Sequence, residues 1–203
     1  MLASLPSELL RSLRLVLVIA VVTGLIYPLV MTGLIQAVFH SQANGSLVER
    51  NGQAVGSTLI GQQFTKPEYF HGRPSATLDP STGKPKPYAA DNSAGSNYGS
   101  SNQALIDRVK KDGQTVRQQN GLPAGTEIPA DLVTTDFSGF DPDISEASAL
   151  LQVNRVAAAR GGGPEKLRSV VERHVQGRVL WVFGQPHVNV LDLNMALDKG
   201  EAA

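Results

Sequence analysis

Cysteine is absent from the 203-residue chain. The protein therefore has no disulfide, no thiolate metal ligand and no cysteine nucleophile, so any folded domain must be held together by its core alone. An excess of charge of either sign is also missing, because 18 Lys and Arg balance 18 Asp and Glu. Without a basic cluster after the first 39 residues, the chain lacks the electrostatic signature of a nucleic-acid-binding protein.

The familiar catalytic motifs are missing as well. There is no Gly-x-Ser-x-Gly, and the four histidines are isolated from one another in the sequence (His40, His71, His174 and His187). Three aspartates, Asp136, Asp141 and Asp143, could gather a hard cation, but Asp residues ahead of a helix usually serve as turn and cap residues. We therefore expect neither a metal site nor an enzyme that acts on its own.

What the chain does contain is a long apolar run, Leu15 to Phe39, without a charged residue. About 25 residues at roughly 1.5 Å each suffice to cross a hydrocarbon core of about 30 Å with some tilt. A cleaved secretory signal is the alternative, since residues 41–43 (Ser-Gln-Ala) resemble a cleavage site. Signal h-regions are shorter, about 7–15 residues, so we favour a retained transmembrane helix over 15–39.

Basic residues flank this run on one side only. Arg11 and Arg14 precede it, whereas the first basic residue after it other than His40 is Arg50. The positive-inside rule then places residues 1–14 in the cytoplasm and residues 40–203 on the exoplasmic side. The length of the second part suits a single domain.

Small or polar residues recur at every fourth position of the span: Ala20, Gly24, Pro28, Thr32 and Gln36. Such residues permit close backbone approach and hydrogen bonds between helices, and Pro28 also frees the carbonyl of Gly24. The simpler alternative is that Gly and Pro are common in membrane helices. We favour a packed face, which predicts that the helix docks on a partner.

The remainder predicts an α+β fold in one domain with long ordered loops. Residues 45–61 indicate a hairpin with Asn51-Gly52 at its turn, followed by a strand through Leu59 and Ile60. The next forty residues are rich in Gly, Pro, Ser and Asn but carry spaced aromatic residues, which favours an ordered, packed loop. Disorder within residues 79–93 is the alternative.

The second half predicts mainly helices. Asn102 and its neighbours cap a helix ending near Gln119, Ser145 caps one ending at Arg160-Gly161, and Pro164 begins a third ending near Gln176. Strands are predicted at two places, residues 131–135 and 178–183. The tail over residues 188–197 begins like a strand and ends like a helix.

Residues 69–77, Tyr-Phe-His-Gly-Arg-Pro-Ser-Ala-Thr, and residues 59–62, Leu-Ile-Gly-Gln, carry a specific resemblance. The chain resembles the KdpC family, the C subunits of the bacterial potassium-transporting ATPase Kdp. The likeness runs through nearly the whole chain in order. It continues in Tyr27-Pro28, residues 42–47, 95–97, 101–102, 129–134, 152–157 and 188–197.

This resemblance implies a single-pass subunit of the bacterial inner (plasma) membrane. Its implied partners are the channel-like KdpA, the P-type ATPase KdpB, the small KdpF and the lipid bilayer. The phosphorylated Asp-Lys-Thr-Gly of P-type pumps is missing here, so ATP hydrolysis would belong to a partner. The family resemblance also implies a catalytic chaperone that raises the ATP affinity of the pump, and an exoplasmic domain near the channel mouth that affects ion access.

The resemblance further implies that the chain itself binds nucleotide. Gln152 and Arg155 are the nearest matches to the family's nucleotide segment, which makes ATP the only cofactor implied. Positive-inside reasoning conflicts with this role, because it puts that segment outside the cell, away from cytoplasmic ATP. The chain also departs from the family pattern at residues 136–140 and at Asn154.

Three residues of the 69–77 segment are candidates for a partner interface: Tyr69, Phe70 and Arg73. Arg73 stands between Gly72 and Pro74, a constrained backbone that could aim its guanidinium at a partner carboxylate or at its own domain. We favour a clamp inside the domain for Arg73. Burial against neighbouring strands is the prediction for Tyr69 and Phe70.

Overall fold

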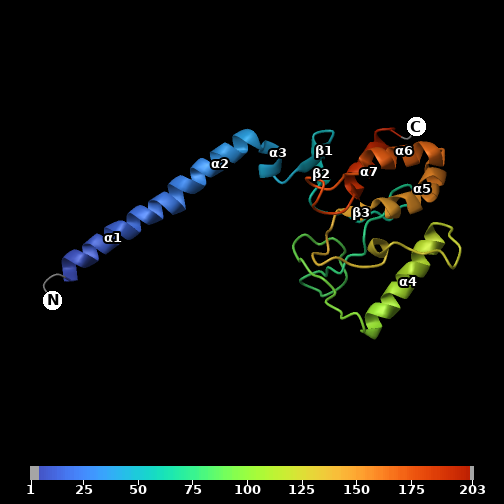
Figure 1. The fold of residues 1–203 in the computed structure, drawn as a ribbon, viewed down its shortest axis with the longest axis horizontal. Helices are drawn as coiled ribbons and strands as arrows, with labels where there is room; N and C mark the ends of the chain where they lie inside the picture. The colour runs from blue at the N-terminus through green and yellow to red at the C-terminus, as the bar shows by residue number, and fades with distance from the viewer. Residues whose placement is uncertain (1–4, 202–203) are drawn as a thin grey trace. The chain divides into compact units, whose positions relative to one another are not determined.

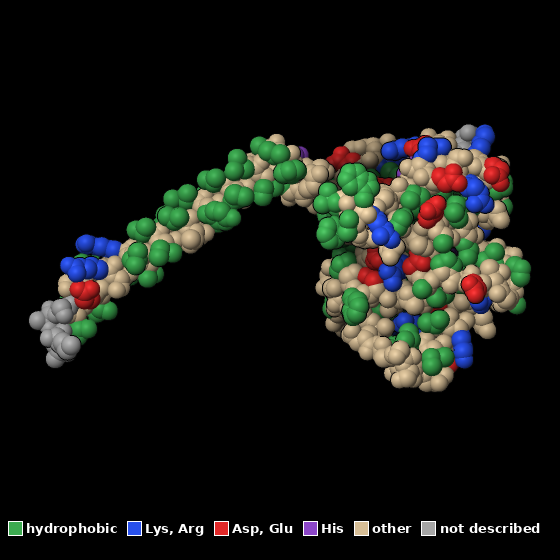
Figure 2. All heavy atoms as spheres, in the orientation of Figure 1, with side chains coloured by type: hydrophobic (Ala, Val, Ile, Leu, Met, Phe, Trp, Pro, Cys, Tyr) green, Lys and Arg blue, Asp and Glu red, His purple; other side chains and the backbone are tan. Residues whose placement is uncertain are grey.

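A single long apolar helix is found in the computed structural model, which describes residues 5–201. It consists of α1 (Leu5–Val21), a π-helical turn η2 (Val22–Ile26) and α2 (Tyr27–Val38). Figure 2 shows hydrophobic side chains along most of its length, with acidic and basic side chains near the N-terminal end. The structure confirms one helix long and apolar enough to cross a membrane; the helix runs from Leu5 to Val38 and so also includes residues that precede the apolar run.

The π-helical turn ends two residues before Pro28. The N–H of Tyr27 donates to the carbonyl of Val22, five residues back rather than four. Proline has no N–H and its ring crowds the preceding turn, and a local widening of the helix relieves this crowding. The helix ends at Val38 with Phe39 as its C-cap, and a short α3 (His40–Ala43) follows. The side-chain amide of Asn44 then donates to the side chain of Gln36 at 3.0 Å.

Residues 47–201 form a separate compact unit that begins with a hairpin. Strands β1 (Leu47–Arg50) and β2 (Gln53–Ser57) pair antiparallel. Asn51 and Gly52 between them both have positive φ, as a type I′ turn requires. The predicted continuation through Leu59 and Ile60 is wrong: Ile60 only bridges back to Ser57, because the chain turns there.

Four helices follow: α4 (Gln103–Gln119), α5 (Glu146–Arg160), α6 (Pro164–His174) and α7 (Val190–Asp198). Their N-caps are those that the sequence predicts for α4 and α5, since Asn102 and Ser145 accept backbone N–H groups. Two short strands, β3 (Asp143–Ser145) and β4 (His187–Asn189), pair antiparallel and lead directly into α5 and α7. In Figure 1, α5, α6 and α7 lie together and α4 stands apart.

The hydrophobic core lies among α5, α6 and α7. These helices contribute mainly Val and Leu at helical spacing: Val153, Val156, Leu167, Val170, Val171, Leu193 and Leu197. Phe70 from the long loop region enters this cluster and is completely buried. The core is therefore closed by a residue that belongs to no helix or strand.

The strand predicted at residues 131–135 is wrong, because a 3₁₀ turn, η3 (Ala130–Leu132), occupies this place. The carboxylate of Asp131 accepts the N–H of Ser145 at 2.7 Å and the hydroxyl of Ser148 at 2.7 Å. The segment thus serves as a polar cap for the start of α5. The 3₁₀ turn places the Asp131 carboxylate at the start of α5, and this contact outweighs the strand propensity of Val133 and its neighbours.

The strand predicted at residues 178–183 is also wrong. The chain doubles back within this stretch, and Val179 pairs with Phe183 in an isolated bridge. Leu180 and Trp181 both have positive φ. Strand propensity expresses packing on a pleated surface, and no neighbouring strand in the described chain provides one.

Residues 62–102 have little regular structure but are tied by side-chain hydrogen bonds. The hydroxyl of Thr77 donates to the carbonyl of Lys86 at 2.6 Å and accepts the N–H of Ala89. The hydroxyl of Ser75 donates to the carbonyl of Gly139 and accepts the N–H of Tyr88. The prediction of long ordered loops is confirmed, and the loops owe their order to these buried polar contacts.

Candidate functional site

The segment 69–73 runs beside α5 and α7 and is held by two side-chain amides. Asn194 of α7 accepts the N–H of Phe70 at 2.8 Å and donates to its carbonyl at 3.0 Å. Gln152 of α5 does the same for His71, at 2.8 and 3.1 Å. Each amide thus replaces the neighbouring strand that an extended segment would otherwise need. We call this pair of contacts the amide clamp.

Arg155 lies one helical turn after Gln152 and extends the clamp. Its guanidinium donates to the carbonyls of Pro67 and Tyr69 and to the side chains of Asn120 and Gln152. Burial lowers the pKa of Arg155 to about 10. Arg155 therefore joins α5, the end of α4 and the segment before Phe70.

Asp198 at the end of α7 anchors the start of the same segment. It accepts hydrogen bonds from Tyr69 at 3.1 Å, from Arg160 at 3.0 Å and from Arg50 of β1 at 2.9 Å. Arg160 also lies over the ring of Tyr69. Burial acts to raise the pKa of Asp198, but the hydrogen bonds from Arg160 and Tyr69 outweigh it, so this pKa lies below its ordinary value.

Arg73 is held by two loops. It pairs with Asp141 at 2.8 Å, while its own carbonyl accepts the hydroxyl of Tyr88 at 2.6 Å. Burial raises the pKa of the Tyr88 hydroxyl, which keeps it protonated as a donor. Arg73 thus forms a clamp between two loops of its own domain. Phe70 is buried in a core that includes Ile144 of β3 and Val188 of β4 as well as residues of the helices, and Tyr69 lies under Arg160 of α5.

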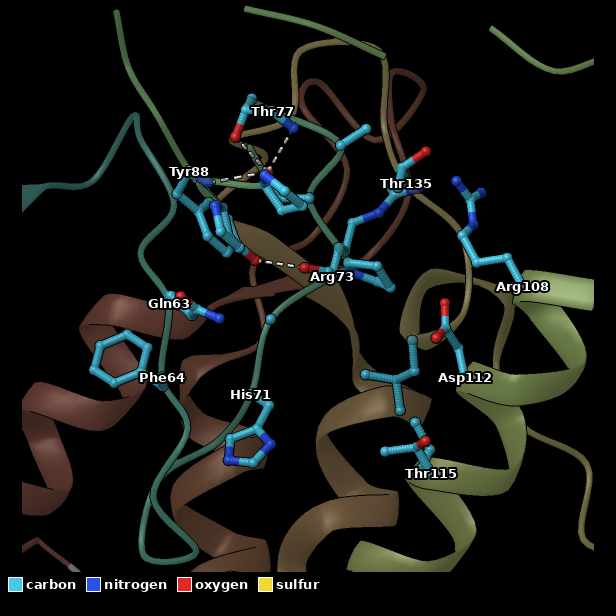
Figure 3. Close-up of a pocket in the computed structure, with 18 of the residues that line it drawn as sticks. Gln63, Phe64, His71, Arg73, Thr77, Tyr88, Arg108, Asp112, Thr115 and Thr135 are labelled. Carbon is cyan, nitrogen blue, oxygen red and sulfur yellow. Dashed lines mark hydrogen bonds between the residues drawn. The ribbon is translucent and has the colours of Figure 1, made fainter. Parts of the chain in front are cut away.

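A cavity of about 740 Å³ opens between this segment and α4. Figure 3 shows His71 and Arg73 on one side, and Arg108, Asp112 and Thr115 of α4 on another. This volume lies within the roughly 300–1,000 Å³ range of small-molecule sites. Gln152, which holds His71, also lines the cavity.

The cavity carries more positive than negative groups. Arg73, Arg108 and Lys111 line it, against Asp112. Among the described residues, the buried side-chain atoms without a hydrogen-bond partner are the Nε atoms of Arg73 and Arg108. Burial lowers the pKa of His71, and the nearby Arg155 lowers it further, so His71 does not add to this charge near neutral pH. The arrangement is suited to an anionic group.

Comparison with known proteins identifies the chain. The model of the KdpC family, described as "K+-transporting ATPase, c chain", matches residues 9–199. The chain belongs to the KdpC family. It is 52% identical to the potassium-transporting ATPase KdpC subunit of Rhodopseudomonas palustris over 199 residues, covering 96% of this chain and 98% of the relative. The KdpC subunit of Methylobacterium nodulans is also 52% identical over 200 residues, with 94% and 98% covered.

Family membership makes the chain one subunit of a potassium-transporting ATPase, and the long apolar helix makes it a membrane-associated one. Five of the residues that the sequence singles out come together around the amide clamp: Tyr69, Phe70, Arg73, Gln152 and Arg155. The row from Ala20 to Gln36 lies on the helix, outside this cluster. No group of three or more metal-binding side chains occurs within residues 5–201.

Sequence reasoning missed Asn194 and Asp198, which hold the segment from α7. For Asn194 the signal was a polar residue between Leu193 and Met195, in the largely apolar run Val-Leu-Asp-Leu-Asn-Met-Ala-Leu. Asn194 is 2% exposed, and a buried amide almost always has a hydrogen-bond partner. The partner, however, lies 124 residues away in the chain.

The amide clamp predicts that Gln152→Leu destabilises the protein although it nearly preserves volume. The variant leaves the N–H and carbonyl of His71 unpaired, at a cost of roughly 1–3 kcal/mol for each buried group. Urea unfolding of the full chain in detergent measures the loss. Gln114→Leu on the exposed face of α4 is the matched control and should stay within about 0.5 kcal/mol of wild type. Equal stability of the two variants would contradict the clamp.

The contacts of Asp198 predict a loss of stability in acid. Because its pKa is lowered in the folded state, its contribution is complete above the ordinary carboxyl value of about 3.9 and disappears as pH falls through the lower folded value. The free energy of unfolding should therefore fall less steeply below about pH 4 in Asp198→Asn than in wild type. Asp107→Asn, exposed on α4, should keep the wild-type slope. Identical slopes for all three proteins would remove Asp198 from this role.

Proposed function

We propose that the chain is a non-catalytic subunit that assembles and stabilises an ATP-driven, high-affinity potassium uptake pump. Its partners are the channel-like KdpA, the P-type ATPase KdpB and the small KdpF, and it acts as a catalytic chaperone for the pump. Membership of the KdpC family supports the pump assignment. The observation that carries the assembly role is an uncovered helix face inside the apolar span.

This face consists of the small and polar row of the span. Ala20, Gly24, Pro28 and Thr32 are exposed, and Gln36 is half-buried. Small residues gain nothing from contact with lipid chains, but they let a second helix approach closely. The π-helical turn before Pro28 disturbs the backbone bonds at mid-span, and a packed partner helix can compensate for such a disturbance. The row therefore suits a protein neighbour.

Bulky substitutions test this face without disturbing the chain itself. A Cβ added at Gly24 meets no atom within 4 Å, and the same holds at Gly33. Gly24→Leu combined with Thr32→Leu should reduce co-purification of the other pump subunits severalfold, because the side chains block close approach. Gly33→Leu, off the row, should retain them. If the Gly24 and Thr32 variant still co-purified fully with the other subunits, the helix would be only a membrane anchor and not a docking surface.

The proposed location is the bacterial inner membrane, with the N-terminus in the cytoplasm and the folded domain on the exoplasmic side. The basic flank at Arg11 and Arg14 supports this orientation. In this position the domain would lie near the external mouth of the channel subunit. There it could affect the access of ions.

The absence of cysteine allows a clean test of orientation. Ser100→Cys and Ser7→Cys place single thiols at exposed positions on either side of the span. A membrane-impermeant maleimide should label Ser100→Cys in intact spheroplasts and Ser7→Cys only after permeabilisation. The reverse pattern would overturn the proposed orientation.

A second candidate function is a nucleotide-binding regulator that raises the ATP affinity of the pump. The cavity favours it, because Arg73, Arg108 and Gln152 line one space large enough for a small ligand. Gln152 would then contact the nucleotide, and Arg155, which donates to Gln152, would hold that side chain in place. The exoplasmic orientation proposed above stands against a role for cytoplasmic ATP.

Equilibrium binding of ATP to the full chain tests the second function. Arg108→Gln changes the cavity without touching the amide clamp, and Arg173→Gln on α6 removes the same charge elsewhere. A nucleotide site in the cavity predicts saturable binding that Arg108→Gln weakens about tenfold or more and Arg173→Gln leaves intact. No saturable binding by wild type would eliminate this function.

A further inference from the structure

An apolar projection stands between α6 and β4. Its base is closed by two backbone hydrogen bonds between Gln176 and His187, at 2.8 and 3.1 Å. Further out, Val179 and Phe183 exchange two more, both at 2.9 Å. The five residues from Val179 to Phe183, Val-Leu-Trp-Val-Phe, form the end of the projection, which we call the apolar tip.

The side chains of the apolar tip point into solvent. Trp181 is 89% exposed, and the other four are between 64% and 69% exposed. Large apolar side chains occur singly on protein surfaces, but five in succession mark a binding surface. No charged residue interrupts residues 179–186, and Arg178 stands at the base of the tip.

The backbone of the tip is held in an uncommon conformation. Leu180 and Trp181 adopt φ values of 52° and 60°, a left-handed region that large side chains rarely occupy. Such a conformation is strained, and strained backbone is concentrated at functional positions. Here the left-handed backbone places five consecutive apolar side chains around one tight turn. In a strand they would alternate between two faces.

The tip also satisfies most of its own backbone donors. The N–H groups of Val179, Trp181, Val182 and Phe183 all donate to carbonyls within residues 178–183. An exposed backbone donor would make entry into a nonpolar medium costly, and internal pairing removes that cost. The tip is therefore compatible with partial insertion into lipid.

Three features favour a lipid occupant over a protein. The chain carries a membrane-spanning helix that ends at Val38, and only residues 39–46 separate it from the domain, so the bilayer is always within reach. Trp, Leu and Phe beside a basic residue make up the composition of interfacial anchors. Finally, the tip stands at the end of a narrow hairpin closed by two β-bridges, and it does not form the broad face that a protein partner would cover.

We propose that the apolar tip inserts into the boundary between headgroups and acyl chains of the same bilayer that the span crosses. Trp181 and Phe183 then lie at the level of the interface, and Arg178 stays among the headgroups. The tip becomes a second membrane contact that fixes the orientation of the domain over the bilayer. This inference rests on the membrane span and does not depend on which side of the membrane the domain occupies.

Trp181 is the single tryptophan of the chain, so its fluorescence reports on the tip alone. The full chain is reconstituted into phosphatidylcholine vesicles, with and without lipids brominated near the headgroup end of the acyl chain. Insertion predicts a blue-shifted emission, at least twofold quenching by the brominated lipid and protection from soluble acrylamide. Emission typical of water, with full acrylamide quenching and none by the brominated lipid, would overturn the proposal.

Two variants distinguish insertion of the apolar tip from a general effect of removing exposed apolar side chains. Leu180→Ser combined with Phe183→Ser keeps Trp181 and should abolish most of the lipid quenching. Leu59→Ser, at another exposed apolar position, should leave it unchanged. A fluorotryptophan label confined to this chain extends the measurement to the assembled pump. Protection that arises only when the other subunits are added would overturn the lipid assignment in favour of a protein contact.

Discussion

The structure depends on the pairing of two side-chain amides with one extended segment. Asn194 and Gln152 satisfy the backbone of Phe70 and His71, which would otherwise be buried without partners beside the core. Because these amides come from α7 and α5, the same contacts join two helices and place Phe70 between them. Arg155, Arg160 and Asp198 hold the residues just before this point. The most specific motif of the sequence is therefore the element around which the domain closes.

This arrangement relates the core to the cavity. His71 is fixed on its backbone side by α5, and its neighbour Arg73 is fixed by Asp141, so the wall of the cavity is a rigid extension of the core. Gln152 and Arg155 hold the segment that forms this wall, whether or not a ligand binds in the cavity. A loss of nucleotide response in variants of either residue would thus report on stability as well as on binding. Arg108, on α4, is the better probe of the cavity because it lies outside the clamp.

Much of the fold could be predicted from the sequence where a local rule decides it. The hairpin turn at Asn51-Gly52, the caps at Asn102 and Ser145 and the apolar helix follow from short patterns. The predictions failed where a distant partner decides: Asp131 turns to cap α5, and residues 178–183 fold back on themselves for lack of a neighbouring strand. Residues 69–77 were visible as a motif, but their partners Asn194 and Asp198 lie more than a hundred residues away.

If the amide clamp closes the domain, residues 69–73 are held as firmly as the helices that they join. Backbone amide hydrogen exchange at Phe70 and His71 measures this directly, since both N–H groups donate to side chains rather than to a sheet or helix. The amide clamp predicts exchange as slow as that of Val153 and Val170 in the core, because opening requires the core to unfold. Exchange as fast as in the exposed loop around Ser100 would contradict it and would make the segment a surface loop that merely lies against the helices.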